Sequence, residues 1–457
     1  MKCRVINSRD VLKVNRFDGS YHNADANVYD EIIRSHSDHN LDYYCSTIFT
    51  SGRAKRLYTK QEFGYPFLSN ADVASQNPLS ACNYASKKYS YDETSFLKGG
   101  MILTGRVGAI GQTSFVPKYW EKYEMMGSDN IIRIVVKPEH KNGFIYAYLA
   151  SKVGNLSFWK HATGGVQPFI TDKMVGNLPI PNFPATFQKE VDDLIQQSAK
   201  YREQASAKLD EAKKVFENQI GVSTTDYSAY KNESISIQSI TGKFKRMDSQ
   251  YQIGHKSIVK EKRNLTTTKI NDIAKAIFTG NRGKRYYVEH DGVHFLSSSD
   301  MMLANPKRFC KLISRRTPNL NELLVKKGTI LISRSGTVGN AILVSDDLNS
   351  CAVSEHAMRL VIDETKISPE YVFAYFCTKQ GKDSLAILPY GSVIVTLGEE
   401  FLGDVDLPLL PKETQDHITA LVKEYSQMTD MAIEKENKAI TMVEQEIEKW
   451  QSPIAKS

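Results

Sequence analysis

The chain lacks paired cysteines, long apolar runs and any histidine spacing typical of a metal site. No apolar run approaches the ~20 residues that cross a bilayer, and residues 1–10 carry charges where a signal peptide has an apolar core. We therefore expect a soluble, cytoplasmic protein with no membrane contact. The cysteines form no CxxC pair, which favours scattered reduced thiols over a zinc site. They are Cys3, Cys45, Cys82, Cys310, Cys351 and Cys377.

Motifs of the common enzyme classes are also missing. Gly105, Gly108 and Gly111 follow a GxxGxxG spacing, which is neither a dinucleotide-binding motif nor a P-loop. A tight strand–turn–strand is the favoured interpretation, and a turn backbone close to a phosphate is the alternative. Asn77-Pro78 and Asn305-Pro306 lack the second proline and the aromatic residue of an adenine methyltransferase motif. The histidines show no paired catalytic arrangement, so we expect no enzyme activity and no metal site.

The sequence contains two copies of one module. Segment 98–111 recurs as 326–339, with the same Gly, Arg, Gly and Gly positions, at an offset of about 228 residues. Segment 48–56 recurs as 277–285 at nearly the same offset. A period this long is too long for a solenoid repeat and indicates two domain-sized copies. Two similar modules in one chain imply pseudo-twofold symmetry, as in a fused dimer.

Each copy has a globular part followed by a long helix. The β-branched runs 130–136 and 329–332 predict strands, and segments 145–153 and 370–378 predict short helices. We expect an α+β fold with two tandem mixed domains. The expected division is a first domain at 1–185, a first helix at 186–220, a linker at 221–243, a second domain at 244–411 and a second helix at 412–452.

Apolar or small residues recur three and four positions apart along both long helices, which predicts a coiled-coil seam. Pro184 and Pro411 precede the helices, and Gly221 supplies a stop signal. Because an amphipathic helix of this length must bury its apolar stripe, the simplest partner is the other helix. An antiparallel pair would give a dumbbell. The residues expected at the inter-helix or subunit contact are Phe187, Val191, Leu194, Tyr201, Leu209, Ile418, Val422, Tyr425, Val443 and Ile447.

Basic residues recur at equivalent positions of the two copies. The net charge of +7 supports nucleic-acid binding only weakly, and a lone basic cluster is usually a solvated face. Because the clusters recur at equivalent positions, DNA binding has the same weight as a solvated face. In the DNA-binding interpretation, some residues neutralise phosphates and others contact guanine edges. The candidates are Arg53, Lys55, Arg56, Lys87 and Lys88 in the first copy, and Arg282, Lys284, Arg285, Arg308, Arg315 and Arg316 in the second.

Together these motifs resemble the DNA-specificity subunits of type I restriction-modification systems. The stretches 178–188 and 407–415 carry a Pro-x-x-Pro-x-x-x-Gln pattern before each long helix, although Phe187 stands where the family often has Glu. The Gly-x-Ile-Leu-x-x-Arg-x-Gly-x-x-Gly segments and a glycine loop before the last strand of each domain also match. The resemblance covers nearly the whole chain and adds further DNA-binding candidates. They are Arg106, Gln167, Arg334 and Ser392.

The resemblance implies an adaptor without an active site. Each domain would be a target-recognition domain that reads one half of a bipartite, asymmetric site in double-stranded DNA. The helices would set the half-site separation and dock two adenine-N6 methyltransferase subunits and a restriction/translocase subunit. S-adenosylmethionine, ATP and Mg²⁺ would bind those partners and not this chain. The alternatives are a specificity subunit of a type IIB-like system, a stand-alone DNA-binding regulator, or a metal-dependent nuclease.

Overall fold

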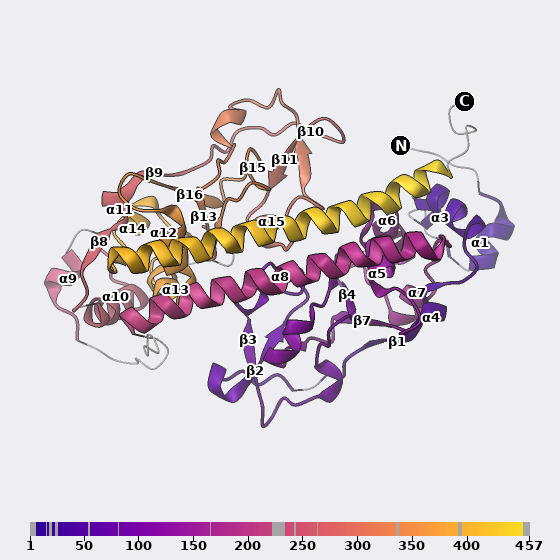
Figure 1. The fold of residues 1–457 in the computed structure, drawn as a ribbon, viewed down its shortest axis with the longest axis horizontal. Coiled ribbons are helices and arrows are strands. Elements are labelled where there is room, and N and C mark those ends of the chain that lie inside the picture. The colour runs from indigo at the N-terminus through magenta and orange to yellow at the C-terminus, as the bar shows by residue number, and fades with distance from the viewer. Residues whose placement is uncertain are drawn as a thin grey trace. The chain divides into compact units, whose positions relative to one another are not determined.

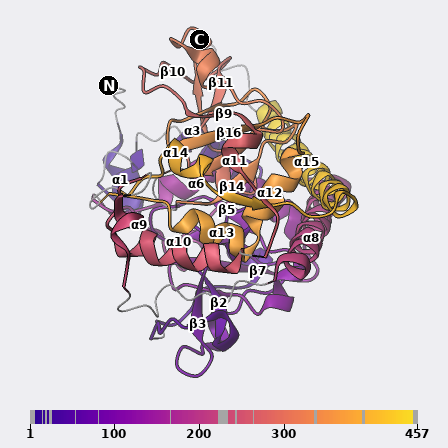
Figure 2. The same ribbon diagram turned by 90° about the vertical axis from the view of Figure 1, so that its left-hand side faces the viewer.

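The structure is a computed structural model that divides into two compact units. Unit 1 comprises residues 1–203 and 431–457, and unit 2 comprises residues 204–430. Both have the mixed α+β character expected from the sequence (Figures 1 and 2). The residues that the structure describes are 6–14, 16–17, 21–22, 26–53, 55–80, 82–164, 166–221, 234–241, 244–262, 264–334, 338–391 and 395–450.

Unit 1 contains two sheets. The larger has the order β1-β7-β4-β5, and its central strand, β7, pairs antiparallel with β1 and β4. The smaller has the order β3-β2-β6, with β2 parallel to β6 and antiparallel to β3. Figures 1 and 2 place β2 and β3 at one extremity of unit 1, beyond the larger sheet. The strands are β1 Cys45–Thr50, β2 Gly64–Leu68, β3 Asn83–Ser86, β4 Ile102–Gly105, β5 Thr113–Phe115, β6 Met126–Gly127 and β7 Ile131–Val136.

In unit 1, α4 and α7 pack on β1, α5 packs on β5, and α3 packs on α6. The segment 145–153, expected as one helix, covers the end of α5 and the start of α6, because Ser151 ends one helix and caps the next by accepting the Gly154 N–H at 3.1 Å. The helices are α1 Ser8–Val14, α3 Ala26–Ser35, α4 Leu41–Tyr44, α5 Asn142–Ala150, α6 Lys152–His161 and α7 Asp172–Gly176. Short 3-10 helices lie at Gln61–Phe63, Pro78–Ser80, Glu93–Ser95 and Lys118–Tyr123.

Unit 2 has a sheet of the same order, β14-β13-β16-β9, and a second sheet, β10-β12-β11-β15, in which β11 and β15 are parallel. A third pair joins β17 to β8. Figures 1 and 2 place β10 and β11 at one extremity of this unit. The strands are β8 Thr267–Lys269, β9 Ala274–Thr279, β10 Tyr287–Val288, β11 Val293–Leu296, β12 Lys311–Ile313, β13 Ile330–Ser333, β14 Ala341–Leu343, β15 Ala352–Val353, β16 Ala357–Ile362 and β17 Asp406–Pro408.

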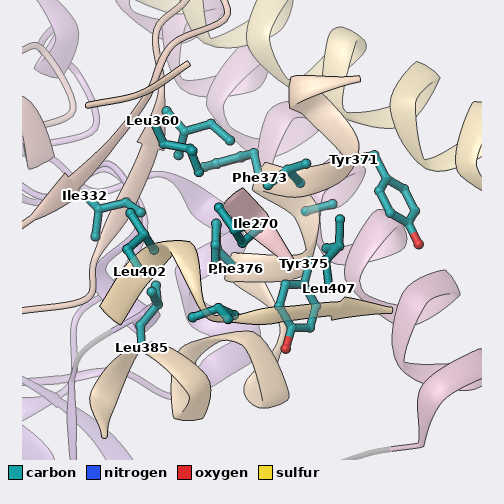
Figure 3. Close-up of a cluster of buried hydrophobic side chains, with 14 of the residues drawn as sticks. Ile270, Ile332, Leu360, Tyr371, Phe373, Tyr375, Phe376, Leu385, Leu402 and Leu407 are labelled. Atoms are coloured by element: carbon teal, nitrogen blue, oxygen red, sulfur yellow. The ribbon is translucent and has the colours of Figure 1, made fainter. Parts of the chain in front are cut away.

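The core of unit 2 lies between the β14-β13-β16-β9 sheet and helix α12 (Figure 3). Ile332 and Leu360 come from the sheet, and Phe373 comes from the helix. Tyr371 is buried too, and its hydroxyl donates to the Pro408 carbonyl at 2.8 Å, so the polar end of this ring is satisfied. The helices are α9 Ile237–Thr241, α10 Ser249–Glu261, α11 Ile270–Ile273, α12 Pro369–Cys377, α13 Lys379–Ala386 and α14 Glu399–Gly403, with 3-10 turns at Asp300–Met302 and Leu320–Glu322.

Two long helices each contribute residues to both units. They are α8, Ala185–Ile220, and α15, Lys412–Lys449, against 186–220 and 412–452 expected from the sequence. Gly221 follows α8 with φ +79°, a left-handed conformation that commonly ends a helix. The expected linker contains α9, and its residues 222–233 and 242–243 lie outside the described part of the chain. No helix that the structure describes is long and apolar enough to span a membrane.

The two long helices contact each other within each unit. In unit 1 the rings of Phe183 and Trp450 stack with centroids 4.7 Å apart, and Ser198 Oγ donates to the Ala432 carbonyl at 2.7 Å. Phe183, just before α8, contacts Trp450, just after α15, whereas Ser198 within α8 contacts Ala432, which is earlier in α15. The two segments are therefore antiparallel. In unit 2, Lys208 pairs with Glu424 at 2.7 Å.

Candidate nucleic-acid interface

In unit 1, one carboxylate holds two of the predicted DNA-binding arginines. Asp129, which is buried, accepts from Arg53 Nε at 3.1 Å and also pairs with Arg56 Nη2. The guanidinium of Arg56 lies over the ring of Phe67 on β2, 5.4 Å from its centroid. The side chain of Arg53 is 81% exposed and that of Arg56 is 42% exposed, so both keep donors available to a ligand. Lys55 beside them is exposed.

Unit 2 has a related arrangement, in which the Arg285 side chain is only 9% exposed and donates to the carbonyls of Asn281 and Gly283. Arg285 Nη2 lies 3.7 Å from the carboxylate of Glu355, and its guanidinium lies over Phe295 on β11 at 5.6 Å. Arg285 also donates to the side chain of Asn281 at 3.2 Å, which shapes the loop between β9 and β10. Arg282 and Lys284 on that loop are exposed.

Tyrosines next to these phenylalanines carry further cations. Tyr287 packs against Phe295 with centroids 6.3 Å apart, and Lys311 Nζ lies over the Tyr287 ring at 5.0 Å. In unit 1, Tyr65 shares β2 with the phenylalanine, and Lys87 Nζ lies over its ring at 5.1 Å. Other predicted cations lie over a ring one or two positions along the chain: Lys88 over Tyr89, Lys284 over Tyr286 and Arg308 over Phe309. Basic groups interleaved with aromatic rings suit a phosphate backbone and the faces of bases.

Sequence reasoning missed two buried arginines behind these clusters. Arg133 on β7 is 0% exposed and Arg359 on β16 is 1% exposed, and both donate to main-chain carbonyls. Burial lowers the pKa of each to about 10, against the field of the nearby carboxylates. The available signal was a single charge inside an apolar run, Ile-Ile-Arg-Ile and Ala-Met-Arg-Leu, repeated in both copies.

The predicted glycine loop is present in unit 1, but it follows the last strand, β7, and among the described residues of this unit only an isolated bridge at Pro179 comes after it. Thr163 and Phe169 close it with reciprocal main-chain hydrogen bonds of 2.9 and 2.7 Å, and Gly164 has φ +103°. Gln167 on this loop is exposed. Arg16 donates to the carbonyls just before the loop, including that of Ala162 at 3.0 Å. The loop therefore presents a polar side chain from a fixed base.

The corresponding loop of unit 2 is closed in the same way. Tyr390 and Thr396 exchange main-chain hydrogen bonds of 2.9 and 2.8 Å, and Arg246 donates to the Pro389 carbonyl at 2.8 Å. Gly391 has φ +110°. The candidate Ser392 lies outside the described residues.

The predicted arginines of the glycine-rich segments are held by the main chain. The Arg106 N–H donates to the Asn130 carbonyl at 2.8 Å, and that of Arg334 donates to the His356 carbonyl at 2.9 Å. Arg334 Nε also donates to the Leu397 carbonyl at 3.1 Å. Both residues thus support the turns that carry the carboxylates described above. The remaining candidates, Arg315 and Arg316, are exposed.

Comparison with known families bears on this geometry. Residues 262–442, which include the Arg285 cluster, match the family described as the type I restriction modification DNA specificity domain. This similarity lies in the second copy of the module and the adjoining part of α15. The resemblance that the duplicated motifs predicted is confirmed by this match. A comparison with curated proteins gives no similar sequence.

Solved structures similar to the chain include two specificity subunits. The type I restriction-modification S subunit from M. genitalium is 12% identical, with 91% of this chain and 95% of that chain covered and a TM-score of 0.34. The HsdS subunit from Thermoanaerobacter tengcongensis is 14% identical, with 89% and 95% covered and a TM-score of 0.27. The type IIG restriction endonuclease BpuSI is 12% identical, with 40% and 29% covered and a TM-score of 0.28. TM-scores this low do not establish a common fold.

The seam residues predicted for inter-helix or subunit contact lie against the cores. Phe187, Tyr201 and Tyr425 are half-buried, and the others are buried. These are Val191, Leu194, Leu209, Ile418, Val422, Val443 and Ile447.

A metal site would need several acidic, histidine or cysteine side chains of the described ranges to lie together. Among these residues no group of three or more His, Cys, Asp or Glu side chains could hold a metal ion. Cys45, Cys82, Cys310, Cys351 and Cys377 are free thiols. Burial raises the pKa of Cys45 and Cys310 to about 12, which makes thiolate chemistry unfavourable there.

Proposed function

We propose that the chain is the DNA-reading, non-catalytic specificity subunit of a type I restriction-modification complex. The observation that carries this is the recurrence of one arrangement, an arginine that lies beside a carboxylate and over the ring of a phenylalanine. It occurs inside the matched specificity domain, at Arg285, and again outside it, at Arg56. Two such clusters in one chain support a bipartite DNA site.

The chemistry of each cluster suits direct reading of DNA. A guanidinium held in a fixed plane can make the bidentate contact with guanine O6 and N7, while exposed lysines and arginines neutralise phosphates. The two clusters differ in composition: in unit 1, Asp129 pairs with Arg53 and Arg56, whereas in unit 2 Glu355 and Asn281 lie beside Arg285. We infer that the two half-sites differ, so that the whole site is asymmetric.

We propose that the outer faces of α8 and α15 dock the catalytic partners. Charged pairs such as Lys189–Asp193 and Lys412–Asp416 occupy these faces. The partners would be two adenine-N6 methyltransferase subunits, which bind S-adenosylmethionine, and a restriction/translocase subunit, which uses ATP and Mg²⁺. This chain would bind none of those cofactors.

Methylome sequencing of the host tests this function. Deleting the gene should abolish one bipartite N6-methyladenine motif, and reintroducing the chain should restore it. An unchanged methylome would contradict the proposal. Purification of the tagged chain separates the remaining alternatives: a partner that carries both methylation and cleavage would mean a type IIB-like system, whereas tight sequence-specific binding with no methyltransferase partner would mean a regulator.

A further inference from the structure

The carboxylates next to Arg56 and Arg285 lie in equivalent tight turns. Asp129 is the second residue of the turn Ser128–Ile131, which the Ile131 N–H closes on the Ser128 carbonyl at 3.2 Å. Glu355 is the second residue of the turn Ser354–Ala357, closed in the same way at 3.2 Å. Each turn leads directly into an inner strand, which is β7 of the β1-β7-β4-β5 sheet or β16 of the β14-β13-β16-β9 sheet. The carboxylates are therefore part of the rigid frame of each unit.

A buried arginine fixes each turn. Arg133 donates to the carbonyls of Ser128 at 3.3 Å and Ile131 at 2.8 Å, which are the first and last residues of its turn. Arg359 donates to the carbonyls of Ser354 at 3.3 Å and Ala357 at 2.9 Å. Burying a guanidinium is costly unless its donors are satisfied, yet both copies retain one. The turn and its carboxylate thus have little freedom to move.

The carboxylate opposes binding to phosphates. Attraction to the DNA backbone is independent of sequence and grows with each cation that can reach a phosphate. A fixed carboxylate within hydrogen-bond reach of Arg53 and Arg56 cancels part of their charge and holds the Arg56 guanidinium over Phe67. A base edge can still replace one of these contacts, because base recognition depends on the plane and direction of the donors.

We propose that Asp129 and Glu355 are specificity-determining residues, which position Arg56 and Arg285 for base edges and suppress binding to phosphates. The inference rests on the proposed function, because it presumes that these units bind DNA. These two acidic residues then discriminate between the target and other sequences. Removing either carboxylate is then expected to strengthen binding to DNA of any sequence.

The test measures DNA binding by the full chain and its variants Asp129→Asn and Glu355→Gln. Fluorescence anisotropy would use a 30-base-pair duplex of unrelated sequence and a duplex with the site found by methylome sequencing. We expect each variant to bind the unrelated duplex up to roughly tenfold more tightly at 0.1 M salt, with the salt dependence steeper by about one phosphate contact. The ratio of affinities for target and unrelated DNA should fall.

Matched controls separate this role from a general charge effect. Glu139→Gln and Glu364→Gln make the same charge change on exposed turns that follow β7 and β16, at the other ends of these strands, and should leave discrimination unchanged. Asp129→Glu keeps the carboxylate and should retain most of it. Thermal unfolding of each variant shows whether the fold is intact. The Glu355 ion pair is longer, so its variant tests the idea if Asp129→Asn fails to fold.

The outcomes distinguish this inference from the proposed function. If the unaltered chain, alone or with its partners, binds neither duplex, the proposed function fails. If it discriminates between them and the folded variants bind unrelated DNA no more tightly, with the same salt dependence, the inference is overturned. Weaker binding of a folded variant to both duplexes would also overturn it, because the carboxylate would then only support the loop.

Discussion

Buried arginines with main-chain partners are the most unusual residues of this protein. A guanidinium has five donors in a rigid fork. Arg133 uses its two Nη groups on the carbonyls of Ser95, Gly127, Ser128 and Ile131, while its buried Nε has no hydrogen-bond partner. An ammonium group could satisfy fewer of these carbonyls. The arginine therefore acts as a cross-link between the end of β6, the turn and the start of β7.

Replacing this arginine should be strongly destabilising. We expect Arg133→Met to lower the free energy of unfolding by about 3 kcal/mol, because several buried carbonyls lose a charged donor. Denaturant unfolding followed by circular dichroism measures the loss. Arg34→Met is the matched control, since Arg34 pairs with Asp30 from a half-exposed position and should cost under about 1 kcal/mol. Equal losses in the two variants would contradict the role given to Arg133.

At the scale of elements, α15 meets unit 1 through a polar triad. Glu436 on α15 is 4% exposed, accepts from the Tyr146 hydroxyl and pairs with Arg202 Nη2 of α8 at 2.6 Å. At the positions that the repeat makes equivalent in unit 2, the residues are Leu209, Phe373 and Thr429, all buried. The two halves of the repeat thus use different chemistry at one position.

This difference makes a stability prediction for α15. We expect Glu436→Ala to cost about 3 kcal/mol, because it removes the buried carboxylate that accepts from the Tyr146 hydroxyl and from Arg202 Nη2. Combining Glu436→Leu with Tyr146→Phe and Arg202→Thr copies the unit 2 set and should recover most of that loss. Chemical denaturation of the single, double and triple variants measures both effects. A triple variant as unstable as Glu436→Ala would show that the triad is not exchangeable.

Some elements could be predicted from the sequence because one local signal decided them. The run 130–136 is rich in β-branched residues and forms β7, and Pro184 and Gly221 bracket α8. The small sheet β3-β2-β6 was not predicted, because short strands carry too few residues for a periodic pattern. The cluster of Arg53, Arg56 and Asp129 in unit 1 was predicted only in part. Arg53 and Asp129 are 76 positions apart, and nothing in their spacing indicates that they meet.

At the scale of the whole molecule, we expect the lengths of α8 and α15 to set the length of the spacer between the two DNA half-sites. Inserting seven residues into each helix, at 203/204 and at 430/431, adds about 10 Å at 1.5 Å per residue. That corresponds to about three base pairs. We expect the spacer between the half-sites to lengthen while the half-sites stay the same, as read by methylome sequencing of a host with the variant.

A control insertion belongs in the sequence-predicted linker, after Gly221. Seven residues added there leave both helices unchanged in length, so the spacer should stay as it is. An unaltered spacer after insertion into the helices would exclude them as the determinant of half-site separation.

The division of α15 between the two units has a consequence for synthesis on the ribosome. Unit 2 is one continuous stretch, residues 204–430, whereas the core of unit 1 needs Ala439, Val443 and Ile447 from near the end of the chain. Most of unit 1 is translated first, but its core stays incomplete until unit 2 and the last part of α15 have been synthesised. A stop codon just after residue 430 would spare unit 2 and leave the earlier-made unit incomplete, exposed to chaperones and proteases.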